Sequence, residues 1–436
     1  MEWVDNILFI GLIIAATVFF TKNVKKISRN INLGKDIDRK DNPMKRLTLM
    51  MRVALGQSKM IVRPIPGILH IIVYAGFVLI NIEVFEIIID GIFGTHRVLS
   101  ALGPFYNFLI GFFEVLAFLV LIACILFLVR RKILKLKRFS GSEMTKWPLL
   151  DANIILTAEI VLMAAILTMN ASDSLLQQMN AEHYKQAGSF PISSMFTFLF
   201  QDFSEGNLIL LERTCWWAHI IGILAYLNYI PFSKHFHIVL SFPNVYFSNL
   251  NAKGKFNNLE SVTNEVKLML DPNVLLPSNT SPQKFGAKDV KDLNWVQLMN
   301  AYTCTECGRC TSNCPANQTG KLLSPRKIMM DTRDRLEEVG NNIDKNGINY
   351  DDGKSLFGNY ISAEELWACT SCNACTESCP INIDPLSIIM DLRRYLVMEE
   401  SAAPTELNGM FTNIENNGAP WQFSPSDRLK WAEESS

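Results

Sequence analysis

Five stretches of this chain are long and apolar enough to cross a lipid bilayer, and they constrain its fold more than any other feature. A bilayer core is about 30 Å thick, and a helix needs about 20 residues to cross it. The stretches are Trp3–Thr21, Ile68–Ile89, Phe105–Val129, Ile154–Met169 and Leu208–Ile230. Because backbone polar groups in lipid must bond to one another, each span must be helical. The sequence predicts an all-α fold that begins with a five-helix membrane bundle.

Two of the stretches have an alternative interpretation. The fourth is the shortest and contains Glu159, which would also fit a core helix of a soluble protein. Its four neighbours favour a membrane span. The first could be a signal peptide, but Glu2 and Asp5 make its start acidic, and it has neither a basic start nor a cleavage pattern of small residues. We expect the first helix to be retained.

Lys and Arg are concentrated in two of the loops between the spans. Residues 22–63 and 130–138 are rich in both, whereas the opposite loops hold little beyond Arg97 and Lys185. Loops rich in these residues stay in the cytoplasm. We therefore expect a multi-pass protein of the inner (cytoplasmic) membrane, with its N-terminus outside and everything after the fifth span in the cytoplasm. The formal net charge of −1 gives no indication of nucleic-acid binding.

Eight of the ten cysteines form two copies of the motif C-x2-C-x2-C-x3-C-P. The first three thiolates of such a run can bind three corners of a cubane, and the fourth is placed to bind the neighbouring cluster. The motif therefore predicts two [4Fe–4S] clusters, one held by Cys304, Cys307, Cys310 and Cys379, the other by Cys314, Cys369, Cys372 and Cys375. Zinc, the alternative, prefers pairs of C-x2-C. Cys124 and Cys215 are interpreted as small buried hydrophobes.

The segments around the motifs indicate an all-helical cluster domain. Helices are predicted over Pro325–Val339 and Pro385–Met398, in place of the strands of a βαβ ferredoxin. Nothing nearby resembles a nucleophile or an acid–base pair, so we expect conduction of electrons and no catalytic residue. The predicted parts are a membrane cytochrome b-like domain (1–240), a connector with an amphipathic helix near Leu259–Leu270 (241–294), a two-cluster α-helical ferredoxin domain (295–400) and a polar docking tail (401–436).

Four histidines are candidate haem ligands, and the first two considered are His70 and His237. His70 lies near the cytoplasmic start of the second span, where an ionisable side chain is costly and usually functional. His219 lies in the outer half of the fifth helix and His237 at its inner end, five turns apart, so both are expected on one face, about 27 Å apart along the axis. His235 would then face elsewhere. We expect His70 and His237 to bind one haem b.

The sequence leaves two alternatives for the outer half of the bundle. Ile80 occupies the position on the second span where a partner of His219 is expected, so His96 is the remaining candidate for the other ligand of a second haem. Alternatively, His96, Arg97 and Glu212 contribute to a quinone site.

These helices resemble a known cytochrome. The five spans, with His70, His219 and the run Pro-Phe-Ser-Lys-His-Phe-His at 231–237, are similar to the gamma subunit of respiratory nitrate reductases, a five-helix cytochrome b. That family carries two ligand histidines on its second helix and two on its fifth. The second helix here keeps only one, so the resemblance implies one haem b and leaves the second open.

The cysteine region resembles a second family. Leu293–Arg326 is similar to the two-cluster part of membrane-bound heterodisulfide-reductase-like proteins, which include electron-transfer-flavoprotein:quinone oxidoreductases. The tail from Asn416 to Trp431 resembles the linker that leads into a cysteine-rich CCG domain in longer members. Since no Cys follows Cys379, the resemblance implies that a separate CCG-domain iron–sulfur subunit supplies that domain.

Together these features predict an electron-transfer subunit of a membrane oxidoreductase. It would pass electrons between the (mena)quinone pool and a cytoplasmic partner such as electron-transfer flavoprotein, through haem b and two [4Fe–4S] clusters. One alternative is a subunit of a heterodisulfide or sulfur-compound reductase, and another is a membrane redox sensor or assembly scaffold. Histidines within the spans favour a conductor over a sensor. Aromatic residues in the polar tail predict that it docks a partner: Phe411, Trp421, Phe423 and Trp431.

Overall fold

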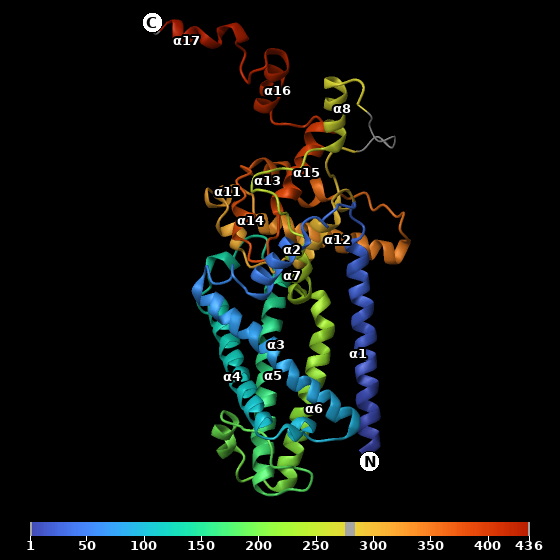
Figure 1. Ribbon diagram of the computed structural model, residues 1–436, viewed down its shortest axis with the longest axis vertical. Coiled ribbons are helices and arrows are strands. Elements are labelled where there is room, and N and C mark those ends of the chain that lie inside the picture. Colours follow the sequence, from blue (N-terminus) through green and yellow to red (C-terminus); the bar gives the residue numbers. More distant parts are fainter. Residues whose placement is uncertain (1, 275–283, 435–436) are drawn as a thin grey trace.

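The computed structural model describes residues 2–274 and 284–434, and this part of the chain is helical with no β-strand. Extended pairing within it is limited to isolated β-bridges, such as the one between Lys35 and Asn294. Met1, positions 275–283 of the predicted connector and positions 435–436 of the predicted tail lie outside the described residues. The predicted fold class, a five-helix bundle followed by a helical cluster domain, is confirmed (Figure 1).

Five long helices build the bundle. They are α1 (Glu2–Ile31), α3 (Pro64–Phe93), α4 (Pro104–Lys132), α5 (Lys146–Gln178) and α6 (Glu205–Tyr229). Each described helix of this set is long and apolar enough to cross a membrane. The fourth predicted stretch belongs to α5, which at 33 residues is the longest of them, because polar residues continue the helix at both ends. Pro64 and Pro104 begin their helices, where a missing N–H costs nothing.

The helices pack with one face inward and one outward. α5 lies between α4 and α6, α3 packs on α4, and α1 lies along α3 and α6. The core of the bundle contains Phe9, Phe113, Ile166 and Ile220. Large apolar side chains such as Phe85, Phe108, Val161 and Leu210 remain exposed on the outward faces, as expected of helices that contact lipid.

The cysteine region forms a compact helical domain at one end of the bundle (Figure 1). We call that end of the bundle the cluster end, and the opposite one, where α3 ends and α4 begins, the far end. The domain's longer helices are α9 (Trp295–Thr303), α12 (Pro325–Asn346) and α15 (Pro385–Met398), and its short ones are α10 (Arg309–Ser312), α11 (Pro315–Gln318), α13 (Ala363–Trp367) and α14 (Ala374–Ser378). α15 has the predicted bounds, whereas α12 continues seven residues beyond the predicted Val339.

Bundle and cluster domain share one hydrophobic core. Ile27 and Ile31 at the end of α1 and Ile230 after α6 belong to the same cluster of buried residues as Leu298 and Leu392. The basic loop after α1 folds into α2 (Pro43–Met50) and a π-helical turn (Met51–Leu55), which pack on α7 (His237–Tyr246). The start of the predicted connector therefore packs against other elements and helps to join the two parts.

One buried cation belongs to that junction. Arg46 of α2 is fully buried and donates hydrogen bonds to the backbone oxygens of Tyr246 and Ser248, each at 2.9 Å. The predicted domain boundaries at 240, 294 and 400 remain predictions. The shared core contains residues from both sides of the first boundary.

The predicted continuous fifth helix is wrong. α6 ends at Tyr229, 3-10 turns cover Ile230–Phe232 and Lys234–Phe236, and α7 starts afresh at His237. Pro231 has no N–H to continue the helix, and Ser233 adopts an extended conformation. His219 and His237 therefore do not project from one face of one helix.

Two parts of the chain extend away from the cysteine domain, one before it in sequence and one after α15. α8 (Glu260–Leu270), the predicted amphipathic helix, and α16 (Thr405–Asn417), followed by turns at Pro425–Leu429 and Lys430–Glu433, extend away from the bundle in Figure 1. The predicted tail thus contains a helix. Trp421 and Phe423 beyond it are 56% and 66% exposed.

Candidate metal centres

Four predicted ligands line a first hollow beside α9. Cys304, Cys307, Cys310 and Cys379 line it together with Cys375, and Met329, Ile381 and Ile383 supply apolar walls. Cys304 ends α9 with an extended backbone, and Glu306 and Gly308 then adopt left-handed conformations, with φ of 56° and 71°. These two reversals curl the loop, so that its three thiols border one space.

The second motif folds in the same way. Ser371 and Asn373 occupy the positions of Glu306 and Gly308 relative to the first cysteine of the motif, and both also have positive φ, 58° and 59°. A second hollow is lined by Cys314, Cys369, Cys372 and Cys375, with Leu323, Leu386 and Ile389. The fourth cysteine of each motif therefore lies with the first three of the other motif, in the grouping that the spacing predicted. Their ligation of iron remains a prediction.

The thiols fit a polynuclear centre. In the described part of the chain no three Cys, His, Asp or Glu side chains lie close enough to hold a single metal ion, and each hollow is lined by at least four thiols. Burial, together with neighbouring thiols, raises the pKa of Cys304, Cys375 and Cys379 to about 12. Buried thiolates need a compensating cation, and iron ions supply that charge.

The two hollows differ in their surroundings. Cys372 at the second hollow is exposed, whereas Cys304 at the first is buried. The first hollow faces the bundle: Arg309 donates to the backbone oxygen of Lys59 at 2.9 Å, and Arg326 pairs with Glu143 at 2.7 Å. The first centre is thus next to the membrane helices and the second is next to solvent.

A buried carboxylate connects the first hollow to the cluster end of the bundle. Glu306, between Cys304 and Cys307, accepts hydrogen bonds from Lys234 and from Arg333, the latter at 2.7 Å. Burial alone would raise the pKa of Glu306, but Arg333 and Lys234 hold it below its usual range. This contact was not predicted from the sequence, because it depends on the break after α6.

Three imidazoles meet at the cluster end. The ring centres of His70 and His237 lie 6.4 Å apart. Two imidazoles that ligate one iron have ring centres roughly 6 Å apart, since each metal–nitrogen bond is about 2.0 Å. His237 Nδ1 bonds to the backbone oxygen of Lys234 at 3.1 Å, which leaves Nε2 for a metal, and His70 Nδ1 is buried without a hydrogen bond to any described residue. The structure brings the predicted pair together.

His235 also belongs to this group, although a continuous fifth helix predicted that it would face elsewhere. Its ring lies 5.4 Å from that of His237, edge to face, and 5.5 Å from that of Tyr226. Burial, followed by the neighbouring His237 and His70, lowers the pKa of His235 to about 3, and burial also lowers that of His237. Neutral imidazole is the form that binds metals.

His219 and His96 do not meet. His219 is buried halfway along α6, with Nδ1 3.0 Å from the backbone oxygen of Leu162 and Nε2 without a partner among the described residues. His96 lies at the far end, 3.7 Å from Asp173. Leu162 and Asp173 are separated by about 16 Å along α5 at 1.5 Å per residue. The structure therefore leaves one ring nitrogen of His219 buried without a partner, as a ligand nitrogen would be, but does not pair His219 with His96.

The far end holds a polar group around Arg97. This buried guanidinium donates to Asp173 at 2.6 Å, to Asn170 at 2.9 Å and to the hydroxyl of Tyr106 at 3.2 Å. Tyr106 in turn donates to Glu86 at 2.9 Å.

His96 joins this group through Tyr184. The two rings lie 5.0 Å apart, and the Tyr184 hydroxyl donates to Glu212 at 3.0 Å. The predicted members His96, Arg97 and Glu212 thus lie in one region, with Asp173 and Tyr184 added by the structure. The buried carboxylates Glu83, Glu86 and Glu114 within apolar helices were the sequence signal that the analysis passed over.

Comparison with known proteins agrees with the cysteine chemistry. Residues 303–383 match the family model described as a 4Fe-4S dicluster domain. The chain is 29% identical, over 99% of its length, to the "Probable iron-sulfur-binding oxidoreductase FadF" of Bacillus subtilis, of which it covers 61%. It is 26% identical, again over 99% of its length, to the "EtfAB:quinone oxidoreductase" of Syntrophomonas wolfei, of which it covers 60%.

A more local match is to the "Probable membrane-anchored ferredoxin" of Chromohalobacter salexigens, 34% identical over 34% of this chain and 24% of that protein. The chain thus spans about 60% of the length of the first two relatives. No solved structure matches. The relatives are iron–sulfur oxidoreductases, and this chain carries a two-cluster [4Fe–4S] domain on a set of membrane-type helices.

Proposed function

We propose that this chain carries single electrons between the (mena)quinone pool of the cytoplasmic membrane and a redox protein of the cytoplasm. His70 and His237 would hold one haem b, and the two sets of four cysteines would each hold a [4Fe–4S] cluster. These groups, when bound, accept and donate one electron at a time. The N-terminus would lie outside and the cluster domain in the cytoplasm.

One observation carries the proposal: a short run of contacts joins the histidine pair to the first cysteine loop. The backbone oxygen of Lys234 accepts from His237, and the side chain of the same Lys234 donates to Glu306 between Cys304 and Cys307. The residue that orients the proposed haem ligand thus also holds the loop of the proposed cluster. Such an arrangement fixes the separation of two redox sites, which a sensor or scaffold would not need.

The far end supports a quinone site. Reduction or oxidation of a quinone moves protons as well as electrons, and Tyr184, Glu212 and His96 are groups that can exchange them. Arg97 would hold its neighbours Asp173 and Tyr106 in place. His219, with its unpartnered Nε2, is our candidate ligand for a second haem between the two ends.

The second hollow supports docking of a soluble partner. Cys372 is exposed, so a protein bound there could approach the second centre closely. Because the relative from Syntrophomonas wolfei is described as an EtfAB:quinone oxidoreductase, we propose an electron-transfer flavoprotein as that partner. Trp421 and Phe423 of the exposed tail would bind a cysteine-rich CCG domain.

The proposal is tested with the full-length protein in detergent under anaerobic conditions. We expect haem b bands in the visible spectrum, and resonance signals of two [4Fe–4S] clusters that change when a soluble menaquinol analogue or its quinone is added. Clusters that respond to dithionite but never to the quinol or quinone would favour the sensor alternative. Haem analysis of the same sample gives one or two haems per chain.

The grouping of cysteines has its own test. Cys379→Ser should alter the resonance signal of the cluster held by Cys304, Cys307 and Cys310, because its side chain lines their hollow. Cys314→Ser is the matched variant and should alter the other signal. A change confined to the opposite cluster in each variant would refute the exchange of fourth ligands.

A further inference from the structure

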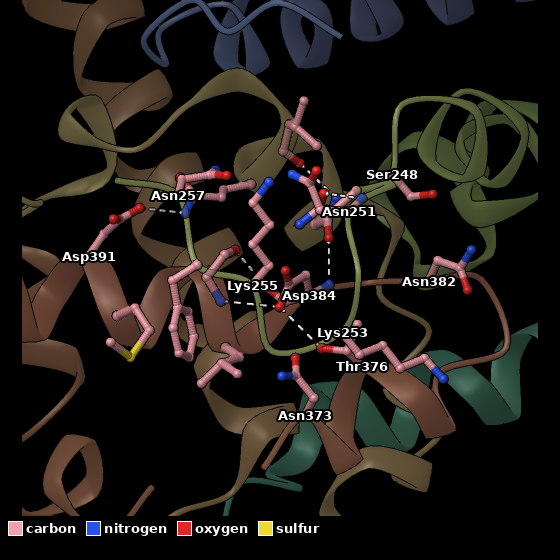
Figure 2. Close-up of a pocket in the computed structure, with 18 of the residues that line it drawn as sticks. Ser248, Asn251, Lys253, Lys255, Asn257, Asn373, Thr376, Asn382, Asp384 and Asp391 are labelled. Atoms are coloured by element: carbon pink, nitrogen blue, oxygen red, sulfur yellow. Dashed lines mark hydrogen bonds between the residues drawn. The ribbon is translucent and has the colours of Figure 1, made fainter. Parts of the chain in front are cut away.

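A polar pocket lies directly beside the second cysteine motif. A strap of residues 248–257 forms one wall, and α15 with the segment from Asn373 to Thr376 forms the other (Figure 2). The pocket has a volume of about 130 Å³ and has no assigned role in the proposed transfer of electrons. Asn373 and Thr376 directly follow Cys372 and Cys375, so the pocket borders the proposed second centre.

Most charges of its wall are already paired. Lys253 pairs with Glu377, and Arg394 pairs with Asp391 at 3.0 Å. Asp384 accepts hydrogen bonds from the hydroxyl of Thr376 and the backbone N–H of Ser387, both at 3.1 Å.

Two cations of the wall have no such partner. Arg39 and Lys255 make no side-chain hydrogen bond or ion pair with any residue of 2–274 or 284–434, and Nε of Arg39 is buried. Burial, followed by the nearby charge of Arg46, lowers the pKa of Arg39. The carboxylates of Asp41 and Asp384 lie near Arg39 and oppose this shift, but neither forms a hydrogen bond or ion pair with its guanidinium.

The strap directs one of these cations inward. Gly254 has φ of 81°, which turns the backbone between two lysines. Lys253 consequently reaches outward to Glu377, whereas Figure 2 shows Lys255 in the middle of the pocket, between Asn251 and Asn257.

Amide groups complete the lining. The side chains of Asn251, Asn257 and Asn373 border the pocket and form no hydrogen bond with another described residue. Each therefore has N–H donors to offer a ligand. Two cations that form no ion pair with a described residue, with several amide donors beside them, suit an oxyanion that carries two charges.

We propose that this pocket binds a phosphate group, either of a nucleotide or as free inorganic phosphate. The guanidinium of Arg39 offers a fork of donors that matches phosphate oxygens, and Lys255 adds a point charge. Bound there, a dianion would lower the reduction potential of the second cluster, since added negative charge disfavours a further electron. This last effect rests on the proposed function, whereas binding itself does not.

Binding is measured on the full-length protein in phosphate-free buffer, by equilibrium dialysis with labelled inorganic phosphate, AMP and ADP. Arg39→Gln and Lys255→Gln should each weaken binding about tenfold or more, the loss of one charge-assisted contact of roughly 1.4 kcal/mol. Neither side chain forms a hydrogen bond or ion pair with a described residue that its replacement would break. Lys267→Gln, on the exposed face of α8 and outside the pocket, is the control and should bind as the wild type does.

Comparison of the three ligands distinguishes a nucleotide site from a site for free phosphate. Nucleotide binding at least tenfold tighter than inorganic phosphate identifies a nucleotide site, and equal affinities identify a free phosphate site. No binding of any of the three ligands, or equal binding by the wild type and both pocket variants, overturns the proposal.

A redox titration followed by electron resonance then measures the second cluster with and without ligand. We expect its potential to fall with ligand in the wild type and to stay constant in Arg39→Gln. Binding with no change in potential would leave the phosphate site intact and refute its regulatory effect. Binding in a protein that does not react with quinol would refute the proposed function alone.

Discussion

The two ends of the helical bundle present opposite solutions for polar groups among apolar helices. At the cluster end, His70, His235 and His237 face one another without a carboxylate among their described ring contacts. At the far end His96 lies among an arginine, carboxylates and a tyrosine. Neutral rings with free nitrogens suit a metal, and paired ionisable groups suit proton exchange. The comparison teaches that histidine alone does not identify a haem site; its neighbours decide.

The energetic reasons for the two arrangements differ as well. Arg97 and Asp173 are both buried, so each needs the other, and removing either would leave a buried charge that costs about 3–5 kcal/mol. The imidazoles at the cluster end are uncharged, so they need no oppositely charged partner. They can therefore bind a ligand without breaking an ion pair that stabilises the fold.

The largest expected effect concerns the cluster end. His237→Ala and His70→Ala should each abolish haem b binding at this site, because both rings are needed to clamp one iron. His235→Ala should retain the haem, since that ring packs on Tyr226 and His237 at the side of the pair. Haem content and visible spectra of the three variants decide this. Loss of haem in His235→Ala with retention in His237→Ala would reverse the assignment.

The far end should respond in rate and not in haem content. Glu212→Gln removes a proton acceptor while keeping the shape of the side chain, and we expect quinol oxidation to slow by about a hundredfold. Tyr184→Phe should behave alike, since its hydroxyl donates to Glu212. Thr214→Ser, an exposed change on the same helix, is the control. Loss of haem in the Glu212 variant would show that the two ends are not separate in function.

The smallest expected effect concerns the contact that joins the cluster end to the first hollow. Lys234→Met leaves Glu306 with Arg333 as its remaining cation, and should lower the free energy of unfolding by about 1–3 kcal/mol. It should also shift the potential of the first cluster and leave that of the second unchanged. Glu306→Gln should cost more stability than Lys234→Met, because it takes the carboxylate away from the buried Arg333 as well. Equal shifts at both clusters would mean that the contact acts on the fold as a whole.

Features that depend on local pattern were predicted from the sequence. The spans follow from apolar length, and α15 begins at Pro385 and ends at Met398 as expected, because proline fits a first helical turn and the apolar residues of this segment recur with helical spacing. The four thiols that the cysteine spacing grouped together line each hollow, although Cys375 lines both of them.

Features that depend on contacts between distant segments were not predicted. The pairing of His70 with His237 was expected on the assumption of a continuous helix, yet it arises because the chain turns at Pro231 and Ser233. The same turn brings His235 into the group, which the assumed helix had excluded. Tyr184 was missed because it lies in a loop whose position depends on the packing of α5 and α6.

The shared core has a consequence for how the protein is made. Asn30 of α1 is buried and donates to the hydroxyl of Tyr302 on α9 at 2.9 Å, and Ile27 and Ile31 belong to the core of the cysteine domain. About 270 residues separate these partners along the chain. The ribosome therefore delivers α1 to the membrane long before the domain that it completes exists. Iron would have to be loaded at the bilayer surface, since a ferredoxin domain released without α1 lacks part of its own interior.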